Sequence, residues 1–200
     1  PLAYDLTELQ RDANRRFGFS AKQTSGVLQR LYEQHKLVTY PRTDSRYLTS
    51  DMTGTLKERL ESVAIGPYAS LARPLLRKNL NITKRVVDDS KVSDHHAIIP
   101  TEETVLLNQL NTEERKLYDL IVRRFISLFF PPARYDAVAV TIDVEGESLH
   151  VKGTTIKESG WREVYGGDVS DESDEDSSAD ADGEESGAQL PVLNEGEAVK

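Results

Sequence analysis

The sequence predicts an α+β protein, mainly helical up to about residue 130 and β-rich beyond it. Two capped amphipathic segments near the start have the spacing of a helix-turn-helix pair, and a third, longer one follows Asn111. After Pro132 the apolar residues change from a helical period to a period of two. The 200 residues suffice for one or two domains, and the absence of cysteine excludes disulfides, thiolate metal sites and cysteine nucleophiles.

The first two predicted helices begin at capping signatures. Asp5 is followed by Glu8 three residues later, and Ser20 is followed in the same way by Gln23, while Gly18 is a typical helix stop between them. Their apolar faces comprise Leu6, Leu9, Ala13 and Phe17 in the first helix and Val27, Leu28, Leu31 and Tyr32 in the second. The short break between them predicts a helix-turn-helix-like pair.

A short strand over residues 37–40 is predicted next, because these residues are β-prone and Pro41 lacks the N–H that would extend the ladder. Helical but broken patterns follow over 51–64 and through Leu71, Leu75 and Leu76, and residues 84–87 and 94–100 have the pattern of loops or short strands.

Asn111, Thr112, Glu113 and Glu114 cap the next predicted helix, which Pro131 and Pro132 close. Its apolar positions are Leu117, Leu120, Ile121, Phe125, Leu128 and Phe129. Valines and Ile142 then alternate with smaller or polar residues from 138 to 144, and a turn at 145–147 leads to a partner strand with Leu149 and Val151.

The net charge of −9 is concentrated in one segment. Residues 168–185 contain ten carboxylates and no Lys or Arg, and without them the chain has 25 basic against 24 acidic residues. Residues 11–47 carry eight basic and three acidic side chains, so a nucleic-acid partner remains possible despite the acidic total. The segment 170–186 is too polar to bury itself and is predicted to be a disordered linker, with a docking site for a basic partner as the alternative.

The composition predicts a cytoplasmic protein without a membrane segment. The most apolar stretch, residues 117–130, contains three charged residues and is too short to span a bilayer. No signal peptide opens the chain, which begins at Pro1 without an initiator methionine, so we expect a piece of a longer protein.

The residues most suggestive of chemistry are Tyr40 and Arg42, at the end of the predicted strand. A phenol can attack a phosphodiester, and a guanidinium can bind phosphate oxygens bidentately and neutralise charge in the transition state. Free tyrosine has a pKa near 10, so a phenol needs activation at neutral pH. On spacing alone, a turn capped by Asp44 and Ser45 with Arg42 at the surface is the preferred interpretation.

The run from Leu37 to Leu48 resembles the active-site signature of type IA DNA topoisomerases, in particular the topoisomerase III branch. The resemblance extends from about Leu6 to Tyr165. It includes Leu9-Gln10, Asp12-Ala13-Asn14, Phe17-Gly18, Thr24, Gln29, Leu31-Tyr32-Glu33, Asp94 to Thr101, and Tyr118, Ile121, Arg124, Phe125 and Phe129.

The resemblance implies a helical nucleophile domain with a helix-turn-helix, CAP-like core over residues 1–105. It also implies the helix and β-hairpin of a β-rich arch domain over 106–167. The composition then predicts the acidic linker over 168–189, and the chain resumes over 190–200 as a strand that we expect to return to the arch domain. The implied catalytic residues are Tyr40 as nucleophile, Arg42 on the scissile phosphate, and His95 near the cleavage site. The implied DNA-binding residues are Arg42, Gln29, Arg15, Arg46, Thr43 and Asp44.

The implied reaction is cleavage and rejoining of single-stranded DNA through a 5′-phosphotyrosyl intermediate, without ATP, by a bacterial enzyme that acts as a monomer. The Mg²⁺ that the family uses would be held by a metal-binding domain absent from this chain, so no metal ligands are predicted here and the isolated chain should be inactive. A metal site at His95 and His96 is disfavoured because adjacent side chains diverge.

Other functions remain as alternatives. A helix-turn-helix regulator would read bases with Ala21, Lys22, Gln23 and Thr24, which only partly suit that role. In a tyrosine recombinase the tyrosine follows the histidine, whereas Tyr40 precedes His95. A non-catalytic scaffold would bind its partner through the acidic run, and the two histidines could also lack a role.

Overall fold

The computed structural model describes residues 1–144 and 147–166, in two compact units. The first unit, residues 1–130, is called the helical unit here, and the described part of the second, residues 131–166, is called the hairpin unit. The center of the turn predicted at 145–147, the acidic linker at 168–189 and the returning strand at 190–200 lie outside the described residues. No helix among those described has the length and apolar character needed to cross a membrane.

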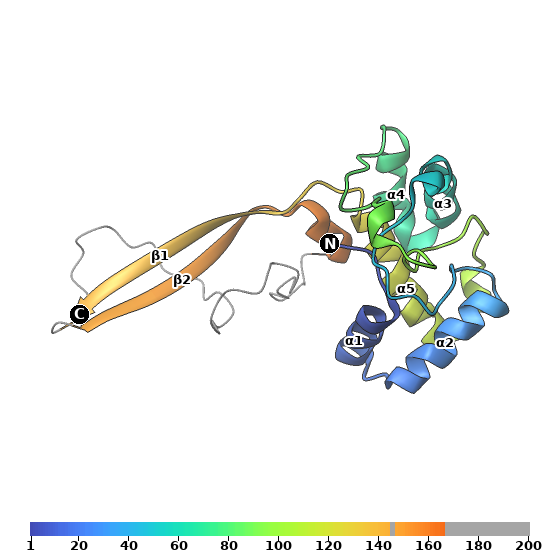
Figure 1. Cartoon of the computed structure of the whole chain (residues 1–200), viewed down its shortest axis with the longest axis horizontal. Helices are drawn as coiled ribbons and strands as arrows, with labels where there is room; N and C mark the ends of the chain where they lie inside the picture. Colours follow the sequence, from blue (N-terminus) through green and yellow to red (C-terminus); the bar gives the residue numbers. More distant parts are fainter. Residues whose placement is uncertain (145–146, 167–200) are drawn as a thin grey trace. The chain divides into compact units, whose positions relative to one another are not determined.

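The helical unit confirms the mainly helical part of the α+β prediction (Figure 1). Its α-helices are α1 (Leu6–Phe17), α2 (Ala21–Glu33), α3 (Leu56–Val63), α4 (Ala69–Leu76) and α5 (Thr112–Ser127). Helices α1 and α2 pack against each other, and α5 packs against both. The predicted helix-turn-helix-like pair is therefore present, with α5 completing its core.

The predicted helix caps form because each relies on side chains close in the sequence. Asp5 accepts a hydrogen bond from the Glu8 N–H at 2.7 Å, and Ser20 accepts one from the Gln23 N–H at 3.1 Å. At the start of α5 the capping box is reciprocal, since Asn111 and Glu114 each accept from the other's backbone N–H. These bonds satisfy N–H groups that a helix cannot satisfy by itself.

Residues 37–40 do not form the predicted strand, because they have no continuous ladder of backbone hydrogen bonds with a neighbouring strand. Val38 forms one isolated antiparallel bridge with Pro100, and comparable single bridges join Tyr4 to Ile98 and Leu48 to Val87. Proline at positions 41 and 100 limits the available N–H donors, so the pairing cannot extend. The helix predicted over 51–64 is also divided, into a 3-10 helix at Ser50–Thr55 followed by α3.

The two compact units meet along the chain between Phe130 and Pro131, so α5 lies in the helical unit. The reason is the apolar face of α5, which is buried in the core with α1 and α2. Its buried apolar residues are Leu117, Tyr118, Leu120, Ile121, Val122, Phe125 and Ile126. The family domain boundary at 105/106 stays a prediction.

The hairpin unit contains the predicted pair of antiparallel strands, β1 (Arg134–Val144) and β2 (Glu147–Glu158). Val140 lies opposite Val151, and a register irregularity occurs beside Tyr135. A 3-10 helix at Gly160–Tyr165 follows, and its Trp161 N–H donates to the Pro131 carbonyl at 2.9 Å.

Candidate active site

The segment carrying Tyr40 is fixed by the side chain of the residue before it. The Thr39 hydroxyl donates to the Ala97 carbonyl at 3.1 Å and accepts from the Ile99 N–H at 3.0 Å, while the Thr39 N–H donates to the Ile99 carbonyl at 3.0 Å. These three bonds attach the tyrosine segment to the segment that carries His95. They substitute for the missing strand ladder and position Tyr40 beside the histidine.

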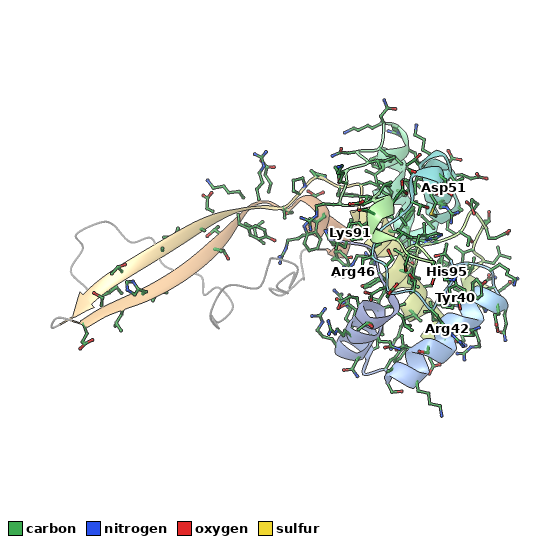
Figure 2. The ribbon with its side chains drawn as sticks, in the orientation of Figure 1. Tyr40, Arg42, Arg46, Asp51, Lys91 and His95 are labelled. Carbon is green, nitrogen blue, oxygen red and sulfur yellow. The ribbon has the colours of Figure 1, made fainter. Side chains whose placement is uncertain are left out.

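Tyr40 is in contact with two other rings. The centroid of its ring lies 4.1 Å from that of His95, with the two planes inclined by 33°, and 5.8 Å from that of Tyr32 in an edge-to-face arrangement. Tyr40 is half-buried, whereas His95 is exposed. The phenol is therefore held between a residue of α2 and an accessible imidazole, near Arg42 in the view of Figure 2.

Arg42 is exposed and makes no hydrogen bond or ion pair with another described residue. The loop around it is nevertheless fixed, because the buried Thr43 hydroxyl donates to the His95 carbonyl at 2.8 Å and accepts from the Ser45 N–H at 3.0 Å. The Thr43 carbonyl also accepts from the Leu6 N–H at 3.0 Å. A guanidinium on a fixed loop, without a partner in the described part of the chain, is well suited to bind an anion.

The two adjacent histidines occupy different environments. His95 lies on the Tyr40 ring, whereas His96 is half-buried and its Nδ1 lies 2.8 Å from the Ala97 carbonyl oxygen. Burial lowers the pKa of His96 below its ordinary value, and the positive charge of Arg59 acts in the same direction. Of the two histidines, His95 is therefore the one in contact with the Tyr40 ring.

Gln29 and Arg42, two of the predicted DNA-binding residues, line one pocket of about 310 Å³. The other lining residues are Leu6, Ser25, Gly26, Leu28 and Pro41. Asp44, two positions beyond Arg42, is exposed and has no partner among the described residues. Gln29 and Arg42 can thus contact the same ligand.

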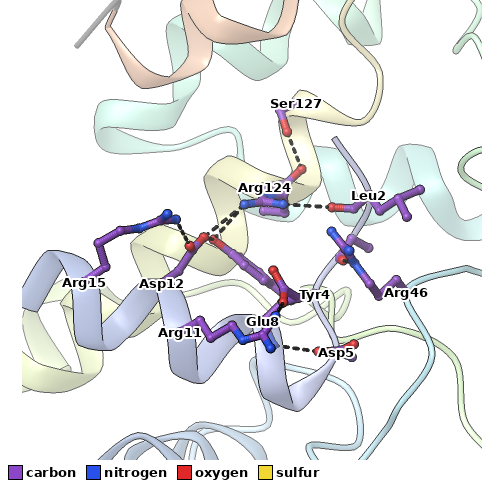
Figure 3. A network of polar contacts seen from close by, with 11 residues as sticks. Leu2, Tyr4, Asp5, Glu8, Arg11, Asp12, Arg15, Arg46, Arg124 and Ser127 are labelled. Carbon is purple, nitrogen blue, oxygen red and sulfur yellow. Dashed lines mark hydrogen bonds and ion pairs between the residues drawn. The ribbon is translucent and has the colours of Figure 1, made fainter. Parts of the chain in front are cut away.

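Arg15 belongs to a cluster of polar side chains centred on Asp12, and Arg46 lies beside that cluster (Figure 3). Asp12, which is 3% exposed, accepts hydrogen bonds from Tyr4, Arg15 and Arg124, the last at 3.0 Å. Arg46 donates to the Ala3 carbonyl at 3.3 Å. Burying a carboxylate is unfavourable unless it is paired, so these cations stabilise the helical unit, and a contact of Arg15 or Arg46 with DNA stays a prediction.

Comparison with known proteins connects this geometry to a family. A family model described as DNA topoisomerase matches residues 1–200. The chain belongs to the DNA topoisomerase family. It is 51% identical over 199 residues to DNA topoisomerase 3 of Bacillus licheniformis and 49% identical over 199 residues to DNA topoisomerase 3 of Bacillus subtilis. These matches confirm the resemblance to the topoisomerase III branch.

The chain spans about a quarter of these relatives, covering 26% of each while being itself covered completely. A solved structure of full-length topoisomerase I from Thermotoga maritima matches 96% of this chain and 29% of its own, with a TM-score of 0.56 and 22% identity. That likeness shows a shared fold, and it confirms the α+β class of this topoisomerase segment.

The Mg²⁺ implied by the family resemblance does not fit the described residues. Within 1–144 and 147–166, no three side chains from His, Asp and Glu are grouped so that they could hold a metal ion.

The helix-turn-helix regulator is disfavoured by the surroundings of α2 in this family member. Gln23 donates to Glu113 of α5 at 2.8 Å, and Thr24 is fully buried, so two of the four side chains proposed to read bases are engaged within the helical unit. A recognition helix needs these N-terminal side chains free to enter the major groove.

Two residues that position the tyrosine were missed in the sequence. The sequence places Tyr32 on the apolar face of its helix and Thr39 in a short strand, and both in family motifs, without indicating that either positions Tyr40. No local signal identifies Thr39, because the backbone groups that its hydroxyl bonds, at Ala97 and Ile99, are 58 and 60 positions away in the chain. The edge-to-face contact of Tyr32 depends on how the chain turns after α2, where Lys36 has a φ of 59°.

Proposed function

We propose that this chain carries the DNA-cleaving nucleophile of a topoisomerase III-like enzyme, and that the nucleophile is Tyr40. The Tyr40 Oη attacks the phosphorus of a single-strand phosphodiester. The Oη–P bond forms as the P–O3′ bond breaks, so a 5′-phosphotyrosyl link and a free 3′-OH result. The phenol proton is lost and the departing O3′ gains a proton, which balances the step. After strand passage the 3′-OH attacks the link and reverses it.

The observation that carries this proposal is the joint placement of Tyr40, His95 and Arg42. The imidazole lies against the phenol ring, with 4.1 Å between centroids, and the adjoining guanidinium has no partner among the described residues. In the proposed mechanism Arg42 binds the non-bridging phosphate oxygens and stabilises the charge that develops on them. His95 contacts the DNA or assists proton movement beside Tyr40.

The proposed partner is single-stranded DNA, bound mainly through its backbone. The phosphotyrosyl ester retains the energy of the cleaved bond, so religation requires no ATP. We assign the required Mg²⁺ to a metal-binding domain outside this chain and propose a monomeric enzyme of the bacterial cytoplasm. The 200-residue chain alone should therefore relax no plasmid DNA and show no specific Mg²⁺ binding by calorimetry.

Replacement of Tyr40 by phenylalanine tests the assignment. In the full-length protein, Tyr40→Phe should abolish cleavage of a single-stranded oligonucleotide and keep its affinity within a few-fold, because only the attacking oxygen is removed. Tyr47→Phe, in the same segment, is the matched control and should still form a covalent adduct, which mass spectrometry would locate on Tyr40. An adduct on another residue, or cleavage by Tyr40→Phe, would refute the assignment.

A further inference from the structure

The pocket beside Arg42 lies between α2 and the loop that follows Tyr40. Its volume of about 310 Å³ is at the lower end of the pockets that hold small organic groups, which are roughly 300–1,000 Å³. Leu6, Leu28 and Pro41 supply apolar walls, and Gln29 and Arg42 supply polar groups. Because Arg42 belongs to both the pocket and the candidate active site, a ligand in the pocket lies next to the reacting phosphate.

Gly26, which lines the pocket, indicates that the pocket is kept open for a ligand. It lies in the middle of α2, and glycine is the least favourable residue in a helix interior apart from proline. Its backbone is not among those with positive φ, so no left-handed conformation requires glycine there. A Cβ built at Gly26 would meet no atom within 4 Å, so packing does not require glycine either. What a side chain at Gly26 would remove is open volume of the pocket.

The polar groups of the pocket can still form bonds with a ligand. The Gln29 amide nitrogen donates to Glu33 at 2.6 Å, which leaves its Oε1 without a partner among the described residues. The N–H donors of the Arg42 side chain likewise have no partner among the described residues. A guanidinium plane also stacks well on flat rings. Apolar walls, one amide acceptor and a stacking cation together fit a flat group with polar edges, which is the chemistry of a nucleobase.

We propose that this pocket holds one unstacked base of the bound single strand, adjacent to the phosphate that Tyr40 attacks. The proposal rests on the proposed function and adds a base subsite to it. Gln29 contacts the edge of the base, and Gly26 keeps the space open. Insertion of one base fixes the register of the strand, so that one particular phosphate lies between Arg42 and Tyr40.

The test fills the pocket from Gly26 and removes bases from the ligand. The full-length protein is titrated with a single-stranded oligonucleotide and with a series of copies, each carrying one abasic site. For the unmodified protein, one abasic position should weaken binding by roughly 5- to 150-fold, the range that alanine substitutions give for one base stacked on an aromatic side chain. Gly26→Leu should weaken binding of the intact strand by a similar factor, and the abasic position should then have no further effect.

Three further variants make the result specific. Gly26→Met fills the same space with a flexible chain and should reproduce the effect, and thermal unfolding shows whether each variant is folded. Gly54→Leu is the matched control, because a Cβ at Gly54 also meets no atom within 4 Å and Gly54 does not line the pocket. Gly26→Ala adds only a methyl group and should reduce affinity less than Gly26→Leu.

The outcomes separate this proposal from the function on which it rests. Unchanged affinity and an unchanged abasic profile in folded Gly26→Leu would overturn the base subsite, while loss of cleavage in Tyr40→Phe would still support the nucleophile. A uniform loss at every abasic position would also overturn the subsite and indicate contacts with phosphate alone. Failure of the unmodified protein to bind or cleave the intact strand would overturn both proposals.

Discussion

On α5, Leu117 and Ile121 are fully buried, whereas Val138 on β1 and Leu149 on β2 are 50% and 56% exposed. Both pairs are apolar, yet only the first removes its side chains from water. The helical unit is therefore stabilised by burial, at about 25 cal/mol per Å² of apolar surface. The hairpin unit depends mainly on its cross-strand pairing, which in a two-stranded sheet is marginal in water. The regularity of an element is thus a poor guide to its stability.

Separating the two units should have the largest effect. Residues 1–130 alone should unfold in one cooperative transition, because the core formed by α1, α2 and α5 lies within them. Residues 131–166 alone should show no such transition. Circular dichroism during heating and the dispersion of amide NMR signals measure both. A cooperative transition in residues 131–166 would show that the hairpin unit is stable on its own, as the helical unit is expected to be.

A matched pair of leucines tests the same contrast in the intact chain. Leu117→Ala should lower the free energy of unfolding by about 2–5 kcal/mol, because it leaves a cavity in the core. Leu149→Ala should change it by no more than about 0.5 kcal/mol, because more than half of that side chain is already exposed. Urea titrations of the two variants compare them directly. Equal losses would mean that Leu149 is buried in solution.

Two arginine substitutions, one in each unit, test whether the proposed DNA cleavage depends on the helical unit. In the full-length protein, Arg42→Lys should reduce the cleavage rate by on the order of 10–10³-fold, because lysine keeps the charge and loses the planar fork. Arg134→Lys on β1, where the arginine is 70% exposed and 3.6 Å from Glu158, should leave the rate unchanged. Single-turnover cleavage distinguishes them, and wild-type rates in Arg42→Lys would exclude the proposed role.

The smallest expected effect concerns how the free energy of unfolding depends on pH, which should differ between buried Glu114 and the exposed Asp136 of the hairpin. Burial tends to raise the pKa of Glu114, but the Asn111 N–H and Arg30 outweigh it, so this pKa lies below its ordinary value of 4.5. The resulting stabilisation is present above pH 4.5 and is lost as the pH falls through the lower folded-state pKa. Glu114→Gln should therefore be less stable than the unmodified chain near neutrality, and the difference should shrink in acid.

The hairpin supplies the control for this measurement. Asp136 and Lys157 form an ion pair at 2.8 Å, with side chains that are 54% and 62% exposed. Water and salt screen such a pair, so Asp136→Asn should leave the pH dependence of unfolding almost unchanged. An acid-dependent loss as large as that of Glu114→Gln would show that exposure does not separate the two sites.

The sequence predicted those parts of the fold that depend on near neighbours. The caps at Ser20 and Asn111 and the helical spacing in α5 are local signals, and the structure confirms them. The strand at 37–40 was wrong because β-propensity depends on a partner, and Pro100 offers Val38 only one bridge.

The candidate site shows the same division. Tyr40 and Arg42 stand out in the sequence because they share one segment and one family signature. The contact of Tyr40 with His95 and the orientation of Thr39 arise between segments that are distant in the chain, and no local pattern encodes them. The pocket at Gly26 was also not predicted, because a glycine in a helix has several explanations until the empty space beside it is seen.

The hydroxyl bonds of Thr39 and Thr43 also affect the order in which the chain folds. They join residues 58, 60 and 52 positions apart, whereas α1 and α2 need only contacts with near neighbours. Closing a loop of that length carries an entropic penalty before any bond compensates it, and contacts between distant residues slow folding. The helices can therefore form while Tyr40 is still apart from His95. Tyr40 meets His95 only when the far segment docks, so partly folded chains lack the assembled candidate site.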